Sequence, residues 1–550
     1  MEGETTRANG DITRDAAALK HSRNGSETGS DISETGPGIS ETRRPAGKKR
    51  KKGAFRALKH RNFRLFWSAQ LISLIGTWMQ NLAQGWLIVL LVDPIGRAML
   101  RHGGNAVGAA PAHHSPAVEA AANIYSGWVN FAGGLPILLF TLLAGVVADR
   151  VDKRRLLILT QACLVFTSIC LGLLCVTGRV EIWHVMVFTA LAGAAAAFDM
   201  PARQAFVVEM VGREDLPSAV ALNSSVFNAA RALGPAVAGL ILAAHISIGV
   251  AFIGNGVLTL APIAVLLMIH VSRRNAAVTP DPAGVSEAPG LTAAEVEAET
   301  GPATLAVDTP EGCVEALEAA EASEDPTERR RQSVLKRLWC NMREGFQYVR
   351  GNATVGNLVL LVGSFGTFAF SFNILVPVFV RYVLLPHAGD AAQVKAFGFM
   401  ETVRGVGALA AAISVAILGN ARRQRNMLIA GALLSTLALI VFARAHTLEV
   451  AYIAMAVASY GFVLCFATSN TLVQLTVPDH LRGRVMSIYT LVFIGTTPVG
   501  SLFVGWVATI AGTANTMLLC AVISLLTALL LVFRPGGLLT IGVPGGAKAA

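Results

Sequence analysis

The sequence has little charge for its length. Its 550 residues are 53% hydrophobic and only 15% charged, and their mean hydropathy is +0.55. A water-soluble protein of this size carries roughly a quarter charged residues, so much of the apolar surface of this chain has to face lipid. The composition therefore excludes a soluble globular fold and predicts a multi-pass protein in contact with a lipid bilayer.

The chain also lacks the residue patterns that disulfides, metal sites and ATP-driven pumps require. Five of its seven cysteines lie inside apolar runs and none belongs to a CxxC pair. It contains no GxxxxGK[ST] phosphate loop and no His, Asp or Ser cluster with catalytic spacing. Three histidines, His102, His113 and His114, lie in a loop whose Gly, Ala and Pro content favours a mobile spacer over a metal site. We therefore expect no cofactor, no bound metal and no enzymatic activity.

Acidic residues are fewer than basic ones, which gives a formal net charge of +10. Ten Lys or Arg and no acid lie between Thr42 and Arg61, just before the first apolar run. Lys and Arg beside membrane spans keep the adjoining loops in the cytoplasm, so we interpret these bases as a membrane anchor and expect no nucleic-acid partner. The short loops rich in Lys and Arg fall on the same side, which predicts that both termini are cytoplasmic.

What the sequence does contain is twelve apolar runs with about the 17–25 residues that a tilted helix needs to cross a bilayer. The runs fall near residues 64–92, 122–147, 156–177, 183–200, 218–244, 249–270, 353–384, 396–419, 427–445, 450–473, 485–511 and 515–533. A long polar segment separates the first six from the last six. The sequence therefore predicts an all-α polytopic membrane protein whose twelve transmembrane helices form two six-helix bundles.

The composition divides the chain into five parts. We expect a disordered basic cytoplasmic tail at 1–61, an N-terminal bundle at 62–270, a cytoplasmic linker at 271–352, a C-terminal bundle at 353–534 and a cytoplasmic tail at 535–550. The linker is acidic and poor in aromatic residues, so it cannot bury a core. Near 333–350, apolar residues recur at helical spacing, which predicts an amphipathic helix on the inner leaflet or, alternatively, a calmodulin-type target.

A weak internal repeat relates the two halves. Residues 207–239 can be laid against 474–502, and each stretch has a proline inside its helix, Pro235 in the first and Pro498 in the second. Weak similarity between halves is common in membrane proteins built from six plus six helices. The repeat predicts that the two bundles are pseudo-symmetric.

A short charged hinge, GVVADRVDKRR, joins the second and third apolar runs. It resembles the signature loop of the major facilitator superfamily, G-x-x-x-D-R-x-G-R-R/K. The matching residues are Gly145, Asp149, Arg150, Lys153 and Arg154, whereas Asp152 stands where the pattern has glycine. The resemblance implies that Asp149 pairs with nearby bases and with the start of the eleventh helix, near Arg484, to close the cytoplasmic side. A carboxylate is favoured there by the helix dipole.

Two further stretches resemble an exporter subfamily of these facilitators. Residues 199–239 and the segment that begins at Phe55 are similar to enterobactin exporters and bacterial drug exporters. Gly234, Pro235 and Gly239 resemble the exporter signature of the fifth helix, where missing side chains allow close packing. The resemblance implies the major facilitator fold, a central cavity between the halves, and outward transport of a small molecule, commonly by proton antiport, in the bacterial inner membrane. We expect the protein to be a monomer.

Charged residues inside apolar runs are the strongest site candidates, because each costs about 2.5–3.5 kcal/mol in hydrocarbon and needs a partner or water. Arg231 ranks first: it attracts an anionic substrate or a carboxylate in the cavity, or it forms a buried structural pair with Asp199. Glu401 and Arg404 are three residues apart and share a helix face, so they form either a proton-carrying site or a static pair.

Amide side chains in the first apolar run are the second group of candidates. Gln80, Asn81 and Gln84 lie there, and Gln80 and Gln84 share a face that Trp78 and Trp86 flank. Such amides line a cavity or, equally, form interhelical hydrogen bonds. Weaker candidates of the same kind are Asn223, Asn228 and Asn373.

Together these features predict a secondary active transporter, and specifically a proton-coupled exporter of a drug, siderophore or metabolite by alternating access. The alternatives are an importer of the same fold and a non-transporting membrane receptor or scaffold. The direction of pH-sensitive flux distinguishes exporter from importer. Movement of any solute by the purified protein excludes the receptor.

Overall fold

The computed structural model describes residues 56–101, 115–244, 246–269, 342–418, 421–534 and 537–540. The three loop histidines and most of the expected tails at 1–61 and 535–550 and of the linker at 271–352 therefore lie outside the described residues. Within the described ranges, every regular element is a helix.

The first half consists of long helices joined by short connections. They are α1 (Arg61–Val92), α3 (Pro116–Arg150), α4 (Lys153–Val176), α5 (Ile182–Ala243) and α6 (Ile248–Met268), with the short η1 (Arg56–Lys59) and α2 (Pro94–Arg101) on either side of α1. α5 contains two membrane-length spans, Ile182–Gly212 and Ser218–Leu242. They meet at a kink at Gly212, whose φ of +69° lies in the left-handed region that glycine adopts without steric penalty.

The second half begins with the helical residues 342–351. After the seventh span come α12 (Asp390–Leu418), α13 (Ala421–Ala443), α14 (Leu448–Thr476), α15 (Asp479–Ala511), α16 (Thr513–Phe533) and the short η6 (Leu538–Thr540). The first part of the amphipathic helix expected at 333–350 lies outside the described residues, and its contact with a membrane stays a prediction.

The seventh span, Ala353–Leu384, is irregular along its second half. α10 (Ala353–Ser364) gives way to the π-helical η3 (Phe365–Phe370), the 3-10 helix η4 (Ser371–Leu375), α11 (Val376–Phe379) and the π-helical η5 (Val380–Leu384). Ser371 Oγ donates to the Gly366 carbonyl over 2.9 Å and so gives that backbone oxygen a side-chain partner. Short π-helical stretches inside a helix often lie at functional sites.

Twelve helical spans in the described residues are long and apolar enough to cross a membrane, which confirms the number predicted from the sequence. Large apolar side chains are exposed on their outer faces, among them Ile417 (74%), Ile510 (72%) and Phe533 (72%). Exposed apolar surface over so many helices is suited to lipid. The chain is therefore an all-α, multi-pass membrane protein.

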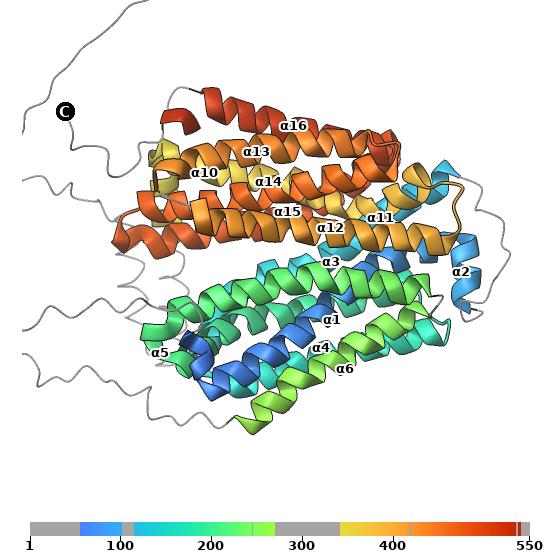
Figure 1. Ribbon diagram of the computed structural model, residues 1–550, viewed down its shortest axis with the longest axis horizontal. Helices are drawn as coiled ribbons and strands as arrows, with labels where there is room; N and C mark the ends of the chain where they lie inside the picture. Colours follow the sequence, from blue (N-terminus) through green and yellow to red (C-terminus); the bar gives the residue numbers. More distant parts are fainter. Residues whose placement is uncertain are drawn as a thin grey trace, which may run out of the picture. The chain divides into compact units, whose positions relative to one another are not determined.

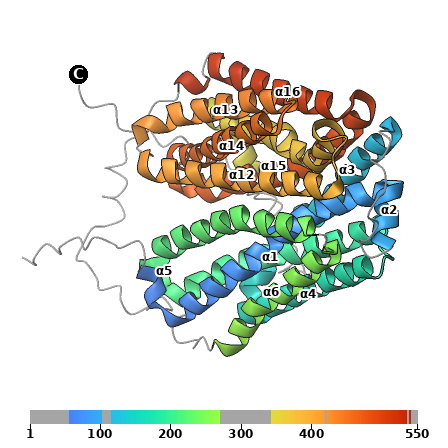
Figure 2. The same cartoon turned by 45° about the vertical axis from the view of Figure 1, so that its right-hand side comes forward.

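The spans form two groups. Figures 1 and 2 show most helices before residue 270, in blue to green, on the opposite side from those after residue 340, in yellow to red, while part of the cyan α3 lies beside the second group. We call the end of the helices where α1 begins the near end, and the end where α1 finishes the far end. α3 packs against α15 and the second span of α5 packs against α12, so each half contributes its second and fifth spans to the contact between the halves.

Glycines bring the backbones together at both of these contacts. A Cβ on Gly398 of α12 would lie 2.6 Å from the Cα of Gly239 in α5. In the matching contact, a Cβ on Gly127 of α3 would lie 2.8 Å from the Ser501 carbonyl oxygen of α15. The two crossings agree with the pseudo-symmetry that the internal repeat predicts, since they join equivalent spans of opposite halves.

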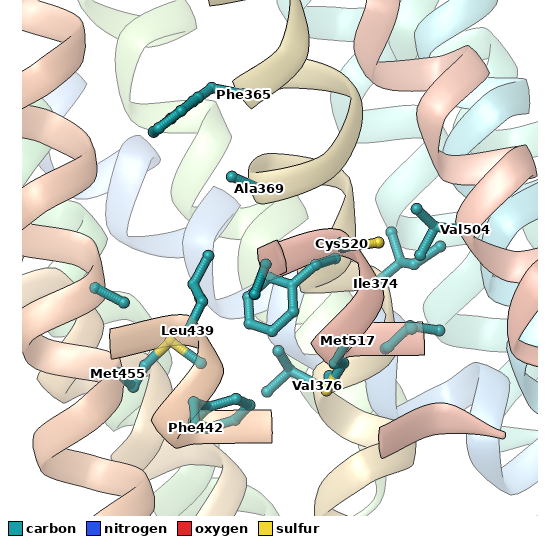
Figure 3. Close-up of a cluster of buried hydrophobic side chains, with 14 of the residues drawn as sticks. Phe365, Ala369, Ile374, Val376, Leu439, Phe442, Met455, Val504, Met517 and Cys520 are labelled. Carbon is teal, nitrogen blue, oxygen red and sulfur yellow. The ribbon is translucent and has the colours of Figure 1, made fainter. Parts of the chain in front are cut away.

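An aromatic and aliphatic core surrounds the irregular seventh span (Figure 3). Phe442 of α13 is fully buried. It contacts Phe372 with ring centres 5.7 Å apart and Phe379 with ring centres 5.1 Å apart. Met455 of α14 and Met517 of α16 complete the packing on either side. This core packs around the irregular span, and the aromatic contacts add to the order that its π and 3-10 backbone bonds provide.

Candidate functional site

A cluster of charged residues lies where the two halves meet. Arg231 is near the middle of the second span of α5, and its guanidinium carbon lies 5.5 Å from the ring centre of Trp78 in α1. Arg231 is also within electrostatic range of Glu401 and Arg404 of α12. Phe227, one turn before Arg231, meets Trp78 edge-on with ring centres 5.5 Å apart. Three residues selected from the sequence are thus brought together from both halves.

On the second half, Arg404 is held by an acid and an amide. Glu401 and Arg404 form an ion pair across one turn of α12. The Nη1 of Arg404 also donates to Oδ1 of Asn373 in η4 over 2.5 Å. The Nδ2 of Asn373 donates in turn to the Phe370 carbonyl over 2.6 Å. The irregular part of the seventh span therefore places the amide that orients Arg404.

The cluster carries more positive than negative charge. Glu401, which is 7% exposed, engages Arg404. The Nε atoms of Arg231 and Arg404 are both buried, and neither has a hydrogen-bond partner among the described residues. Two guanidinium groups face one carboxylate, and a buried cation without a partner is costly. The arrangement is suited to binding an additional acceptor.

One face of α1 is directed at this cluster. Trp78 contacts Arg231 on that face. Gly85, seven residues later, lies so close to the seventh span that its Cβ would be 3.6 Å from Pro377 Cγ. Asn81 lies between them at helical spacing, so it shares their face, and its side chain is exposed in the middle of the span. An exposed amide at this depth, turned toward the other half, fits the lining of a polar cavity.

The other two candidate amides, Gln80 and Gln84, lie on a different face of α1. Gln80 on this face contacts α4 and α6. The Oε1 of Gln80 accepts 2.7 Å hydrogen bonds from Ser168 Oγ and from Asn255 Nδ2. For Gln80 the structure therefore favours the interhelical alternative. Gln84 is half-buried, one turn further along the same face.

Asp199 belongs to a separate network closer to the near end. It forms an ion pair with Arg203 one turn later in α5. Its Oδ1 accepts hydrogen bonds from Thr160 Oγ1 over 3.0 Å and from Gln161 Nε2 over 2.7 Å. The pairing of Asp199 with Arg231 that was considered from the sequence is therefore wrong, because Arg203 holds this carboxylate.

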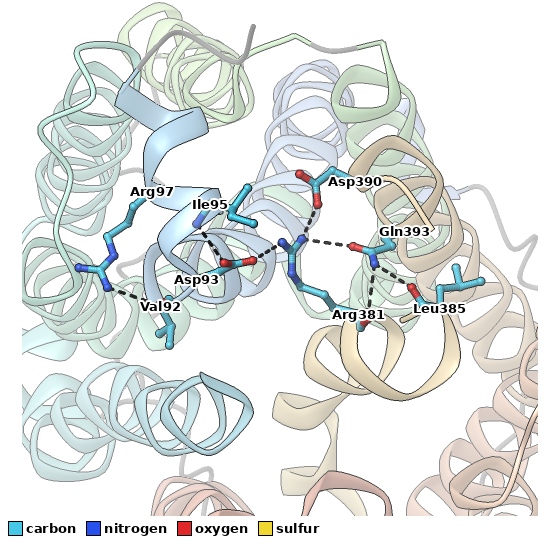
Figure 4. Close-up of polar contacts among 8 residues, drawn as sticks. All are labelled: Val92, Asp93, Ile95, Arg97, Arg381, Leu385, Asp390 and Gln393. Atoms are coloured by element: carbon cyan, nitrogen blue, oxygen red, sulfur yellow. Dashed lines mark hydrogen bonds and ion pairs between the residues drawn. The ribbon is translucent and has the colours of Figure 1, made fainter. Parts of the chain in front are cut away.

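A buried ion pair joins the halves at the far end, and Figure 4 shows the polar contacts around it. Arg381 at the end of the seventh span pairs with Asp93 at the end of α1, and its Nη1 lies 2.6 Å from Asp390 Oδ1 of α12. The same nitrogen also donates to Gln393 Oε1 over 3.2 Å. The side chains of Arg381 and Asp93 are only 5% and 2% exposed. Trp86 covers the guanidinium, with its ring centre 5.7 Å away.

A second polar contact at the far end ties α3 to the start of α16. Thr513 donates its backbone N–H and its hydroxyl to Glu119 Oε1 over 3.0 and 2.6 Å. The Nδ2 of Asn123 donates to Thr513 Oγ1 over 3.0 Å. With the Arg381 contacts, these bonds connect the halves at the far end.

The hinge between α3 and α4 lies at the near end, where its described bases contact their own half. Lys153 Nζ lies 2.6 Å from Glu209 Oε1. Arg154 donates to the carbonyl groups of Leu266 and Leu267 at the end of α6 over 2.6 and 2.9 Å. Gly145 lies in α3, where a Cβ would meet nothing within 4 Å. The side chains of Asp149 and Arg150 lie outside the described residues.

Arg484, the partner that the resemblance implies for the hinge, forms an ion pair with Glu344 of the helical residues 342–351. Gly345 packs beside it, since a Cβ there would lie 2.8 Å from Ile488 Cδ1. The helical residues 342–351 therefore contact the start of α15, and this contact lies within the second half.

The three signature positions of the fifth span lie at close contacts. A Cβ on Gly234 would lie 2.5 Å from Trp78 Cβ, so this glycine lets α5 approach α1 beside the charged cluster. Gly239 faces Gly398 as described above, and the Pro235 carbonyl oxygen would be 3.4 Å from a Cβ on Gly398.

The far-end network was not selected from the sequence. One feature of the sequence could have identified it: Arg381 lies inside the seventh apolar run. A charge inside a run needs a partner, and Asp93 is the acid next to the first run.

Comparison with known proteins gives sequence relatives. A family model described as Major Facilitator Superfamily matches residues 66–493 and 383–539. The multidrug efflux pump Tap of Mycolicibacterium fortuitum is 24% identical over 413 residues, which cover 74% of this chain and 86% of that pump. A staphyloferrin A transporter of Staphylococcus aureus is 35% identical over 123 residues, which are 22% of this chain and only 31% of the transporter.

Solved structures resemble the fold as well. A crystal structure of an auto-inhibited POT family peptide transporter gives a TM-score of 0.55 at 16% identity, covering 87% of this chain and 99% of that chain. A POT family transporter in complex with 5-aminolevulinic acid gives 0.54 at 12% identity, covering 86% and 95%. At these identities the likeness shows the fold alone.

Proposed function

The chain belongs to the major facilitator superfamily of transporters, and from that premise we propose that it exports a small molecule across the cell membrane in exchange for protons. We further propose that the near end and both termini face the cytoplasm, and that the monomer is the working unit. The basic residues beside the first span support this orientation.

The observation that carries the proposal is the position of the charged cluster. Arg231 and the Glu401–Arg404 pair come from opposite halves near the middle of their spans. On one side of them, the Arg381 and Thr513 contacts tie the halves together. On the other side, Lys153 and Arg484 contact partners within their own halves. A central polar site with one tied end is the arrangement that alternating access requires.

Export, rather than import, is supported by the exporter-like fifth span and by the likeness to a protein named as an efflux pump over most of both chains. An importer of the same fold is the second candidate. For coupling we propose Glu401 as the proton-carrying residue, because it is a buried carboxylate whose partner Arg404 could release it when another anion arrives. The hinge residue Asp149 is proposed to close the near end in the other state.

The test is flux in liposomes that contain the purified protein, with and without an imposed pH gradient. A drug and siderophore sensitivity screen of a deletion strain first supplies a substrate. We expect the gradient to drive the substrate against its concentration gradient, and Glu401→Gln to abolish that response while leaving downhill exchange. Glu449→Gln is the matched control, since Glu449 is an exposed acid at the start of α14.

Full pH-driven transport by Glu401→Gln would remove this residue from the coupling mechanism. Accumulation in the direction opposite to export would favour the importer. A protein that moves no solute of the screen would leave a receptor or scaffold as the better description.

A further inference from the structure

Arg231 is a partly buried cation, and none of the described carboxylates forms an ion pair with it. Each neighbouring carboxylate on the described residues is engaged elsewhere: Glu401 holds Arg404, and Asp199 holds Arg203. What faces the guanidinium of Arg231 is the ring of Trp78. A cation–π contact offsets part of the cost of burial, yet it satisfies no N–H donor. Arg231 Nε accordingly has no hydrogen-bond partner among the described residues.

Arg404, which comes from the other half, also has a donor without a partner among the described residues. Its two Nη groups bind Glu401 and Asn373, whereas its Nε is buried and has no partner among the described residues. Arg231 and Arg404 belong to different halves and repel one another electrostatically. An anion between them would relieve that repulsion, and guanidinium groups bind carboxylates with paired, charge-assisted hydrogen bonds.

The surroundings also indicate what the rest of such a ligand would be. Trp78 and Phe227 provide aromatic faces on the first half, edge to face with one another. Asn81 is an exposed amide on the face of α1 that Trp78 occupies. This mixture of aromatic walls with a few fixed polar groups is typical of sites for small, partly apolar molecules.

We propose that the substrate is an organic anion, whose carboxylate binds Arg231 and Arg404 while its apolar body packs against Trp78 and Phe227. This inference rests on the proposed function, because it names the substrate class of the same site. The anion joins one residue from each half, so its binding favours the state in which the halves approach around the site.

The test compares three ligands that share one ring system and differ in charge: 1-naphthoate, 1-naphthamide and 1-naphthylmethylammonium. Binding to the full-length protein in lipid nanodiscs is measured by titration calorimetry. We expect 1-naphthoate to bind at least tenfold more tightly than 1-naphthamide, and the ammonium compound to bind most weakly. Arg231→Gln should reduce 1-naphthoate binding to the level of the amide and leave 1-naphthamide binding unchanged.

Two further variants separate a ligand contact from a structural effect. Arg231→Lys keeps the charge but loses the paired donors, so its preference for 1-naphthoate should be intermediate. Arg444→Gln removes an exposed arginine at the far end of α13 and should change nothing. The proposal is overturned if 1-naphthoate does not bind, if the amide binds as tightly, or if Arg231→Gln keeps the preference.

The binding test of the anion site does not depend on the direction of transport or on its coupling to protons. A carrier that exports a cation under a pH gradient would keep the proposed exporter and remove the anion site. A protein that prefers 1-naphthoate through Arg231 but shows no pH-driven flux would keep the anion site and remove the proposed proton exchange.

Discussion

Two arginines of this chain occupy opposite electrostatic settings. Arg381 is almost fully buried and has Asp93, Asp390 and Gln393 around its guanidinium. Arg231 lies at mid-span, faces an aromatic ring and has no such acid. A buried cation with full compensation is suited to holding helices in register, whereas one without it is suited to an exchangeable partner. The two residues look alike in the sequence, and only the structure shows that Arg381 has acceptors around it and that Arg231 Nε has none among the described residues.

The sequence singled out three charges that the structure brings together, but it did not identify the contacts of the other charges. Arg231, Glu401 and Arg404 could be selected because a charge inside an apolar run is expensive. The pairing of Asp199 with Arg203, four residues away, was missed because a more distant partner was considered instead. Asp93 and Arg381 were missed because their contact joins residues 288 positions apart. Such contacts depend on how the two halves dock, which local pattern does not encode.

The close approach of α5 and α12 at Gly398 can be tested with a single substitution. A Cβ at this position would lie 2.6 Å from Gly239 Cα, so Gly398→Ala requires the backbones of α5 and α12 to move apart. Overpacking of this kind costs about 1–3 kcal/mol. We expect the purified variant to melt several degrees below the wild type and to transport more slowly. Gly389→Ala is the control, because a Cβ there meets nothing within 4 Å; equal melting of the two variants would contradict the close crossing.

Among the elements, the seventh span departs most from the regular helix that its apolar run predicted. The π-helical and 3-10 turns between Phe365 and Leu384 place Asn373 against Arg404 and Arg381 against Asp93. Both the central cluster and the far-end network thus depend on one irregular element. Its existence and length were predictable from hydropathy. Its breaks were not, because they are fixed by packing against α13 and α15.

The first element, η1, is held to the near end of α5 by an acid-dependent contact. Asp215 Oδ2 lies 3.0 Å from His60 Nε2, and Asp215 Oδ1 lies 3.2 Å from Arg56 Nε. Ala57 N–H donates to Ser218 Oγ over 3.2 Å beside this pair. The hydrogen bond from His60, with the charges of Arg56 and Lys59, lowers the pKa of the Asp215 carboxyl below its ordinary value.

The lowered pKa of Asp215 sets the pH at which the contact between η1 and α5 weakens. An Asp whose pKa is lowered by folding stabilises the folded contact above its unfolded pKa of about 3.9, and that contribution is lost as the pH falls through the lowered value. We expect hydrogen exchange of residues 56–59, corrected for the intrinsic pH dependence, to accelerate as the pH drops below about 4. In the Asp215→Asn variant, the amides of residues 56–59 should exchange faster than in the wild type at every pH at which the wild type is protected. Equal protection of the wild type at pH 3 and pH 6 would contradict the assignment.

At the scale of the whole molecule, the two halves are joined by contacts of two kinds. Glycine crossings such as Gly239 with Gly398 depend on shape and lie along the helices. The far-end contacts of Arg381 and Thr513 depend on charge and hydrogen bonding. The glycine crossings can act as pivots while the polar contacts break and form. A hydrogen bond or ion pair is lost once its atoms move apart by a small distance. If the proposed transport proceeds by rocking of one half against the other, we expect these polar contacts to control it.

Asp93 is the contact whose loss should open the far end. Its side chain is 2% exposed, and removing its charge leaves Arg381 with Asp390 as its remaining acid. Breaking a buried ion pair costs about 3–5 kcal/mol. A loss of about 3 kcal/mol is enough to change the ratio of closed to open molecules by about two orders of magnitude. We therefore expect Asp93→Asn to populate a state in which the far ends of the two halves are separated.

Spin labels at Arg179 and Arg444, exposed far-end positions of the first and second halves, allow this to be measured by electron–electron double resonance in nanodiscs. The wild type should give one short distance, and Asp93→Asn should add a longer one. Asp390→Asn is the matched control: Asp390 is 26% exposed, so solvent replaces its contact at lower cost and the longer distance should be less populated. An unchanged distribution in Asp93→Asn would mean that the Thr513 contacts or the glycine crossings alone hold this end shut, and the ion triad would then be a consequence of closure rather than its cause.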